Sequence, residues 1–460
     1  MRYVSTRGKA PVLSFDDVLL AGLARDGGLY VPERWPVVTA EQWRAWRSLT
    51  YGQLAVEVMA PFVDGSLTRD ELAALVDRSL GSFGHRAIAP LKQLGANHYV
   101  LELFHGPTLA FKDYALQLVG NLFEHVLERR GDHVTIVGAT SGDTGSAAIE
   151  ACRDRRNVRI FILHPHGRVS DVQRRQMTTV HSSNVTNLAV DGTFDDCQDL
   201  VKGLFADEAF RDEVHLSAVN SINWARIMAQ VVYYAWTALQ LGAPDRSVGF
   251  AVPTGNFGNI FAGYVARQMG LPIERLVIGS NRNDILTRFT HSSAMRITGV
   301  EPSLSPSMDI QVSSNFERLL FELLGRDGAR VEELMRGFRE HGVMEVDEAF
   351  MTAFRSLFGA TRYDDEQTGA IIRRTLDETG ELLCPHSAIG VQAAIDDRAF
   401  GSLPMVSMAT AHPAKFPDAV EQASGVRPGL PPRMADLFER EERLQRIGND
   451  IEALKAVVRG

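Results

Sequence analysis

The segment from His105 to Asp113 places one lysine, Lys112, among apolar residues. The lysine follows Leu-Ala-Phe and stands between a Gly-Pro turn and a run with helical patterning over Tyr114 to Leu127. Desolvation disfavours the ammonium form, so a lysine in such a place keeps more of the neutral amine that attacks a carbonyl carbon. A lysine beside an aspartate is commonly a surface ion pair, however, and this segment taken alone leaves both interpretations open.

Two glycine-rich turns follow, each between an apolar, strand-like run and a helical run. They read Thr-Ser-Gly-Asp-Thr-Gly at residues 140–145 and Pro-Thr-Gly-Asn-Phe-Gly-Asn at residues 253–259. Glycines let the main chain approach a ligand closely, and backbone N–H groups at a helix N-terminus bind anions. The second turn lacks both the Walker lysine and the G-x-G-x-x-G spacing, which disfavours nucleotide sites. One candidate amine and two such turns predict a phosphorylated carbonyl cofactor.

Five separated motifs, in the same order, resemble those of the threonine synthases. They are ELFHGPTLAFKD at residues 102–113, TSGDTG at 140–145, NSIN with R, Q and YY at 220–234, PTGNFGN at 253–259 and ATAHPAKF at 409–416. The resemblance runs from about Gly28 to about Phe416 and covers most of the chain. It implies an α/β protein of the PLP-dependent fold type II (tryptophan synthase β-like), with parallel sheets flanked by helices and a mostly helical N-terminal domain.

The resemblance also implies a reaction. Threonine synthases use pyridoxal 5'-phosphate (PLP) to convert O-phospho-L-homoserine and water to L-threonine and phosphate by β,γ-replacement, the last step of threonine biosynthesis. Lys112 would hold the cofactor as a Schiff base, and its amine, once freed by the substrate, would move protons as general base and acid. The alternatives are another PLP-dependent phospho-amino-acid lyase or dehydratase on the same fold, or a PLP-binding homologue that serves as a scaffold.

The resemblance implies that, besides Lys112, residues of three motifs contact the cofactor. Its phosphate is expected at the second turn, on Gly255, Asn256, Phe257, Gly258 and Asn259. No Lys or Arg lies there, so backbone N–H groups and the helix N-terminus would bind the dianion. Asp143 is expected near the ring oxygen and Thr410 opposite the pyridine nitrogen, where a hydroxyl favours elimination and replacement over transamination. Without the family, Asp143 fits an ordinary helix-capping turn and Thr410 the end of a strand before a proline turn.

An anionic substrate needs local cations, because the protein's net charge of −9 opposes it. The residues expected at the substrate are Arg226 and Lys415 for its phosphate, with Ser221 and Asn223 as neutral donors, and Ser141 and Thr144 for its carboxylate. The run from Asn220 to Arg226 is expected to open a long helix, on which Asn223 and Arg226 share a face. An exposed helix arginine accounts for Arg226 equally well.

Composition places the chain among ordinary globular proteins. Of its 460 residues, 45% are apolar and 23% charged, and the acidic balance argues against nucleic-acid binding. The three cysteines are widely spaced with no CxxC pair, so neither a disulfide framework nor a metal site is expected. No run approaches the roughly 20 apolar residues of a membrane helix, and no signal peptide is recognisable. A cytoplasmic monomer or homodimer without a membrane partner is predicted.

From residue 134 onward, short β-branched runs alternate with helical runs, as in a parallel sheet covered by helices. The expected regions are an N-terminal threonine-synthase-type domain over 1–95, a PLP-binding catalytic region over 96–430 (two α/β subdomains, roughly 96–215 and 216–430) and a C-terminal helical tail over 431–460. Helices are expected over Ala40 to Tyr51 and Arg69 to Leu80. Apolar residues at helical spacing predict one further helix over Met434 to Val457, with one face packed on the body or on a partner.

Overall fold

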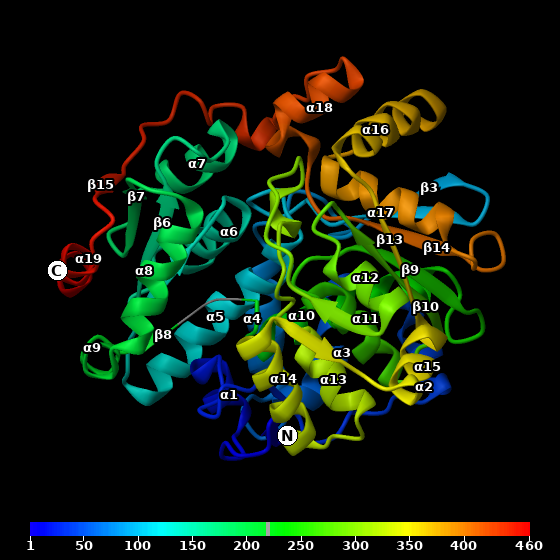
Figure 1. Ribbon diagram of the computed structural model, residues 1–460, viewed down its shortest axis with the longest axis horizontal. Helices are drawn as coiled ribbons and strands as arrows, with labels where there is room; N and C mark the ends of the chain where they lie inside the picture. The colour runs from blue at the N-terminus through cyan, green and yellow to red at the C-terminus, as the bar shows by residue number, and fades with distance from the viewer. Residues whose placement is uncertain (218–220) are drawn as a thin grey trace.

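The computed structural model describes residues 1–217 and 221–460, which form two largely parallel sheets with helices packed on them. Figure 1 shows a five-stranded sheet on the left and a six-stranded sheet on the right. The predicted α/β class with parallel sheets flanked by helices is confirmed. Within the described ranges, none of the helices is both long and apolar enough to cross a bilayer.

The N-terminal residues form α-helices and a two-stranded antiparallel sheet, β1 (Tyr3–Ser5) with β2 (Tyr30–Pro32). The helices are α1 (Phe15–Ala21), α2 (Ala40–Ala45), α3 (Tyr51–Val63) and α4 (Arg69–Leu80). The helix predicted over Arg69 to Leu80 is confirmed. The one predicted over Ala40 to Tyr51 is wrong beyond Ala45, because a 3-10 turn (Trp46–Ser48) interrupts it and the Thr50 hydroxyl caps a new helix.

The five-stranded sheet carries the first glycine-rich turn. In spatial order its strands are β15 (Gln445–Ile447), β7 (Val185–Val190), β6 (Val158–Pro165), β5 (Val134–Ala139) and β8 (Leu216–Ser217), all parallel. The connecting helices include α6 (Asp143–Cys152), α7 (Asp171–Thr178), α8 (Phe194–Ala206) and α9 (Glu208–Glu213). Since β5 runs directly into the turn and then into α6, the turn lies at the carboxyl edge of the sheet, where ligands bind in open parallel sheets.

The six-stranded sheet carries the second turn. In spatial order its strands are β13 (Phe358–Arg362), β10 (Ile273–Ser280), β9 (Val248–Pro253), β14 (Met405–Ala409), β4 (His98–Glu102) and β3 (Leu91–Gly95), parallel except for β3. Helices α10 (Trp224–Gln240) and α11 (Gly258–Gln268) pack on one face and α17 (Pro385–Asp396) on the other. Neighbouring side chains of β10 point to opposite faces of the sheet. Ile278 packs in the core cluster that contains α11, and Val277 packs in the cluster that contains α17.

Helix α5 (Lys112–Arg130) joins the two halves, because it packs against α6 of one and α10 of the other. Its start is tied to the end of β14, where Phe111 N donates to Thr410 O at 2.8 Å. The start of α5 thus meets the carboxyl ends of the parallel strands. The remaining helices include α12 (Ile285–Ser292), α13 (Phe316–Leu323), α14 (Gly328–His341), α15 (Glu348–Leu357), α16 (Asp365–Thr379) and α18 (Pro417–Ser424).

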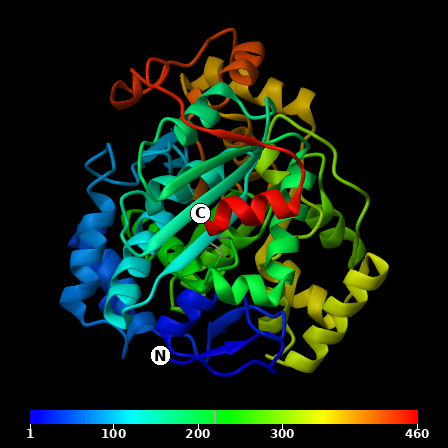
Figure 2. The ribbon, with the colours of Figure 1, turned by 90° about the vertical axis from the view of Figure 1, so that its left-hand side faces the viewer.

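The predicted single helix over Met434 to Val457 is wrong. These residues contain the strand β15, which pairs with β7, and most of a shorter helix, α19 (Ile451–Arg459), which packs on α8. The Asp450 side chain caps that helix, and its residues Leu454 and Val458 are fully buried. The tail therefore covers the edge of the five-stranded sheet, as the red segment in Figure 2 shows.

Candidate active site

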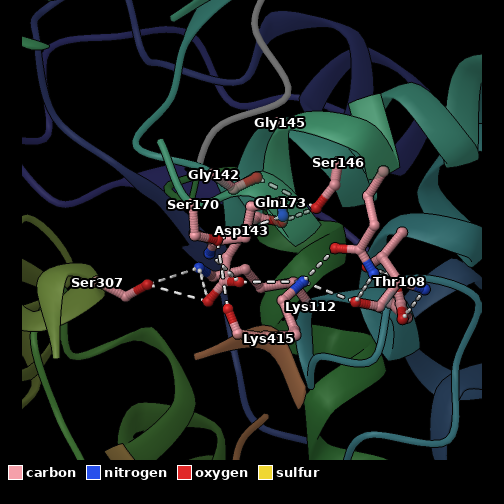
Figure 3. Close-up of polar contacts among 12 residues, drawn as sticks. Thr108, Lys112, Gly142, Asp143, Gly145, Ser146, Ser170, Gln173, Ser307 and Lys415 are labelled. Atoms are coloured by element: carbon pink, nitrogen blue, oxygen red, sulfur yellow. Dashed lines mark hydrogen bonds and ion pairs between the residues drawn. The ribbon is translucent and has the colours of Figure 1, made fainter. Parts of the chain in front are cut away.

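Lys112 begins α5 and is only 9% exposed. Its Nζ donates to Asp143 Oδ2 at 3.4 Å and to Ser307 Oγ at 3.3 Å, as Figure 3 shows. Burial lowers the pKa of Lys112 below its ordinary value, although the Asp143 carboxylate opposes the shift. The structure therefore gives this lysine the desolvated surroundings that the sequence predicts, and with them a larger neutral fraction than a lysine has in water.

Asp143, the first residue of α6, lies at the centre of a buried polar cluster. Its Oδ1 accepts from Gln173 Nε2 at 2.8 Å and lies 3.1 Å from Lys415 Nζ, while its Oδ2 accepts from Ser307 Oγ at 3.1 Å. Burial by itself would raise the pKa of Asp143, but the Lys415 and Lys112 ammonium groups hold that pKa well below its ordinary value. The carboxylate is therefore ionised between two lysines.

Lys415 does not face open space. It is 0% exposed, and its Nζ donates to Thr108 O at 2.7 Å and to Gln176 Oε1 at 2.9 Å in addition to its contact with Asp143. An ammonium group has three N–H bonds, and these three acceptors use all of them. The geometry thus gives no support to the predicted role of Lys415 as a ligand of the substrate phosphate.

The second glycine-rich turn joins β9 to α11, and its side chains point into the protein. Phe257 takes a left-handed φ of 63° and packs on Phe316 with ring centroids 5.2 Å apart. Asn259 Oδ1 accepts hydrogen bonds from the hydroxyls of Tyr233 and Tyr234 at 2.7 and 3.0 Å. A ligand at this turn would consequently meet main-chain N–H groups at the N-terminus of α11, which suits a phosphate.

A segment that precedes α13 supports the same turn. Ser313 Oγ donates to Gly255 O at 2.6 Å, and Asn315 donates to Asn256 O from its backbone N at 3.1 Å and from Nδ2 at 3.0 Å. The packing is close, because a Cβ at position 255 would lie 3.1 Å from Ser307 O. The requirement for glycine there is steric, and the turn is fixed from both sides.

The first glycine-rich turn is organised by Thr140. Its Oγ1 accepts from the backbone N of Gly142 at 3.0 Å and of Gly145 at 2.8 Å. Gly142 has a φ of 140°, and a Cβ there would lie 2.5 Å from Gln173 Cδ. Ser141 and Thr144 are partly exposed while their neighbours in the turn are buried. Ser141 and Thr144 are therefore the more accessible side chains of this turn.

Thr410 directly follows β14, beside the start of α5, and is 5% exposed. Its backbone N donates to Ser387 Oγ at 3.1 Å, and its carbonyl accepts from Phe111, the neighbour of Lys112. The structure thus brings Thr410 to the same place as Lys112, as the motif analysis predicts for a residue beside the cofactor.

The substrate candidates just before α10 differ in their contacts. Asn223 is 0% exposed, its Oδ1 accepts from Ala225 N at 3.0 Å and its Nδ2 donates to Leu19 O at 2.8 Å, so it serves as a helix cap. The helix begins at Trp224, and Asn220 lies outside the described residues. Ser221 Oγ accepts from Asn256 Nδ2 at 3.0 Å and joins this region to the second turn.

Arg226, also on α10, is 3% exposed and is not the exposed helix arginine that the sequence left open. Burial lowers the pKa of Arg226 to about 10, and its positive charge is among the causes that lower the pKa of Lys112. The two cations are therefore near enough to influence each other, as expected of residues around one anionic substrate.

Three residues of the cluster were missed by the motif analysis: Ser307, Gln173 and His386. His386, on α17, has its Nε2 as acceptor for Ser307 N at 3.4 Å, and burial lowers the pKa of His386 to about 4, which keeps the ring neutral. None of the three lies in a glycine-rich turn. The one sequence signal is the Ser-Pro run at residues 302–306, which predicts a loop without giving it a task.

Known families match residues 2–458 of the chain, apart from residues 81–84. Residues 2–80 match the family described as "Threonine synthase N terminus", residues 85–410 the family "Pyridoxal-phosphate dependent enzyme" and residues 387–458 the family "Threonine synthase, C-terminal". The last match includes the tail with β15 and α19, to which the resemblance in the sequence did not extend.

Full-length relatives agree with the family matches. The chain is 58% identical to a threonine synthase of Pseudomonas aeruginosa, over 100% of this chain and 98% of that protein, and 41% identical to one of Saccharomyces cerevisiae, over 99% and 97%. A PLP-bound threonine synthase from Brucella melitensis has 56% identity and a TM-score of 0.98, with coverage of 100% and 99%. The Escherichia coli threonine synthase structure has 29% identity and a TM-score of 0.84, with the same coverage.

Proposed function

The chain belongs to the threonine synthase family of PLP-dependent enzymes, and from that premise we propose its substrate and the tasks of its residues. It converts O-phospho-L-homoserine and water to L-threonine and phosphate. The observation that carries the proposal is the buried Lys112, which contacts an ionised Asp143 of the first glycine-rich turn and also Ser307, a residue packed against Gly255 of the second. Few arrangements other than a carbonyl cofactor with a phosphate would use all of these features.

The residues present fit the cofactor. The main chain of Gly255, Phe257 and Gly258 would hold its phosphate at the N-terminus of α11, and Lys112 would attach its carbonyl carbon. Thr410 would face the ring nitrogen and Asp143 the ring oxygen. When bound, pyridoxal phosphate supplies an electron sink for negative charge at the substrate's carbon atoms.

Lys112 would move the protons. Burial lowers its pKa, so its amine can be neutral when a proton must be taken from the substrate's α-carbon. Asp143 then stabilises the ammonium that forms, because its carboxylate lies 3.4 Å from Nζ. The same group can return the proton, which makes one lysine sufficient as base and acid.

Two parts of the site would bind the substrate's anions. Arg226 is the candidate cation for the phosphate, with Ser221 as a neutral donor, since Lys415 has its three N–H bonds occupied. Ser141 and Thr144, at the N-terminus of α6, are the candidates for the carboxylate, where hydroxyls and the helix dipole both favour negative charge.

We further propose a cytoplasmic enzyme that acts as a monomer or a homodimer. Support for a reducing compartment comes from Cys152, Cys197 and Cys384, which are free and buried. Size-exclusion chromatography with light scattering distinguishes the two assembly states.

The test is product analysis with purified, cofactor-loaded protein given O-phospho-L-homoserine. Phosphate and threonine should form in equal amounts, and Lys112→Ala should produce neither. Phosphate with a keto acid in place of threonine would identify a lyase. If the cofactor-loaded protein releases no phosphate from O-phospho-L-homoserine, the proposed substrate is wrong.

A further inference from the structure

A closed ring of buried contacts connects the two lysines of the cluster. Lys112 Nζ contacts Asp143 Oδ2 at 3.4 Å, and Asp143 Oδ1 lies 3.1 Å from Lys415 Nζ. Lys415 then donates to Thr108 O, and Thr108 donates to the Asp113 carboxylate from its N at 2.8 Å and its Oγ1 at 2.6 Å. Asp113 is the next residue after Lys112, which closes the ring. Figure 3 shows four of its members, Lys112, Asp143, Lys415 and Thr108.

We infer that Lys415 is a positioning residue: it is the permanent counter-cation of Asp143, which allows Lys112 to gain and lose its proton beside a carboxylate of constant charge. This inference rests on the proposed attachment of the cofactor to Lys112 and is independent of the substrate's identity.

The two lysines differ in their hydrogen bonding. Lys415 is fully buried with an acceptor for each N–H, whereas Lys112 is held by two longer contacts of 3.4 and 3.3 Å. Three short contacts hold the Lys415 ammonium in place beside Asp143, whereas the longer contacts of Lys112 leave its amine free to gain and lose a proton.

A buried anion without a cation beside it destabilises a protein. If Asp143 had Lys112 as its only lysine, deprotonation of Lys112 would leave a carboxylate without a cation in a buried site, which is unfavourable. With Lys415 in place, Asp143 keeps a cation at 3.1 Å throughout. Lys415 therefore uncouples the proton of Lys112 from the charge of Asp143.

The charges that act on Lys112 come from several elements. They determine in which direction each variant moves the pKa of Lys112. Burial, Lys415 and Arg226 lower the pKa of Lys112, while Asp143 raises it. His386 on α17 is near Asp143 but its own pKa of about 4 keeps it neutral. Lys415→Met removes a repelling cation and makes Asp143 depend on Lys112, so Lys112 should hold its proton to higher pH; Asp143→Asn should act in the opposite direction.

The experiment is a pH titration of the visible absorption band of the cofactor-loaded protein. Lys415→Met should move the midpoint upward by about one pH unit and Asp143→Asn downward by a similar amount. The matched control is Lys455→Met, a lysine on α19 paired with Asp207 and Glu452, which should titrate as the unmodified protein does. A Lys415→Met midpoint that equals the control's would overturn the inference.

A second measurement covers a variant that folds poorly. Removing one partner of a buried pair destabilises a protein more than replacing both, so Asp143→Asn/Lys415→Met should unfold at a higher temperature than Lys415→Met alone. Additive losses in the double variant would contradict the pairing. A raised KM for the substrate without a moved midpoint would instead make Lys415 a substrate ligand. Loss of the band in Lys112→Ala tests the proposed attachment separately, since that variant keeps Lys415.

Discussion

Two opposing influences meet at Lys112. Burial favours its neutral amine, and the Asp143 carboxylate favours its ammonium. Catalysis by proton transfer needs both forms to be accessible near the working pH. A lysine in water is almost entirely charged there, so the burial at the start of α5 is the feature that makes the residue useful.

Replacing Lys112 by alanine should abolish turnover and leave the fold intact. Asp143 still has Lys415 as its cation, so the variant contains no unpaired buried carboxylate. We expect the rate to fall by at least about 10³-fold, the order contributed by a positioned acid–base group, together with loss of the cofactor's visible band. Circular dichroism checks the fold. A variant with normal turnover would show that another residue does the chemistry.

The neighbouring Asp113 should make stability depend on pH. Burial raises the pKa of Asp113 to about 6 from the model-peptide value of 3.8, although Thr108 donates to it. Between these pH values the folded protein retains a proton that the unfolded chain has released, so this group disfavours folding as the pH rises. Asp113→Asn should therefore gain stability relative to the unmodified protein, by up to about 3 kcal/mol, between about pH 4 and pH 7.

Urea unfolding of both proteins over that pH range measures the difference. A difference that stays constant with pH would mean that Asp113 is ionised throughout and that its hydrogen bonds outweigh its burial.

At this scale the sequence identified residues that lie inside motifs and failed where contacts join distant segments. Lys112, Asp143 and Thr410 stand next to turns or strand ends, and the fold brings them together. Lys415 was also identified from its motif, but the motif does not reveal that Thr108 and Gln176 accept hydrogen bonds from its Nζ, so its role at the substrate phosphate stays a prediction without geometric support. Ser307, which contacts Lys112, lies 195 positions later in the chain, in a short 3-10 turn after a Ser-Pro run that predicts a loop and no role in the site.

Among the elements, the turn between β9 and α11 is the proposed binding site of the cofactor's phosphate. Gly255→Ala would place a Cβ 3.1 Å from Ser307 O and from Ile310 Cδ1, so the turn must shift. We expect cofactor affinity to fall by about tenfold or more, since phosphate binding depends on the alignment of backbone N–H groups. Gly429→Ala is the matched control, because a Cβ there meets nothing within 4 Å. Spectroscopic titration with the cofactor compares them, and equal affinities would place the phosphate elsewhere.

The tail shows how an element is mispredicted. Apolar residues such as Ile447, Ile451 and Leu454 stand at helical spacing, which suggested one helix. Ile447 is buried instead by strand pairing of β15 with β7, and Leu454 and Val458 by packing in the cluster beneath α8. The Gly448-Asn449 break and the Asp450 cap were visible in the sequence, but strand pairing with a segment 257 positions earlier was not.

At the scale of the whole molecule, the N-terminal residues belong to the main core. Tyr3 and Trp224 share one core cluster with Phe316, and Arg7 makes a bidentate ion pair with Glu317 of α13 at 3.0 and 2.9 Å. Both partners are buried, at about 5% exposure. The N-terminal domain over residues 1–95 therefore remains a prediction, and the hydrophobic core continues across its boundary.

Glu317→Ala should destabilise the entire chain. It leaves Arg7 as a buried charge without its carboxylate and removes the acceptor of the Thr6 hydroxyl. We expect a loss of about 3–5 kcal/mol in the free energy of unfolding, with the N-terminal helices and the sheets still unfolding together. Glu345→Ala, which breaks an exposed pair with Arg296, should leave the unfolding midpoint unchanged. Separate transitions for the two regions in urea would contradict the shared core.

The most direct test of the account is to locate the cofactor's attachment. Borohydride reduction of the cofactor-loaded protein fixes the carbonyl carbon to the lysine that holds it, and peptide mass spectrometry then identifies that lysine. We predict a single modified residue, Lys112, with Lys415 unmodified although it lies in the same cluster. Modification of Lys415, or of any lysine outside the cluster, would contradict both the site and the roles assigned to its residues.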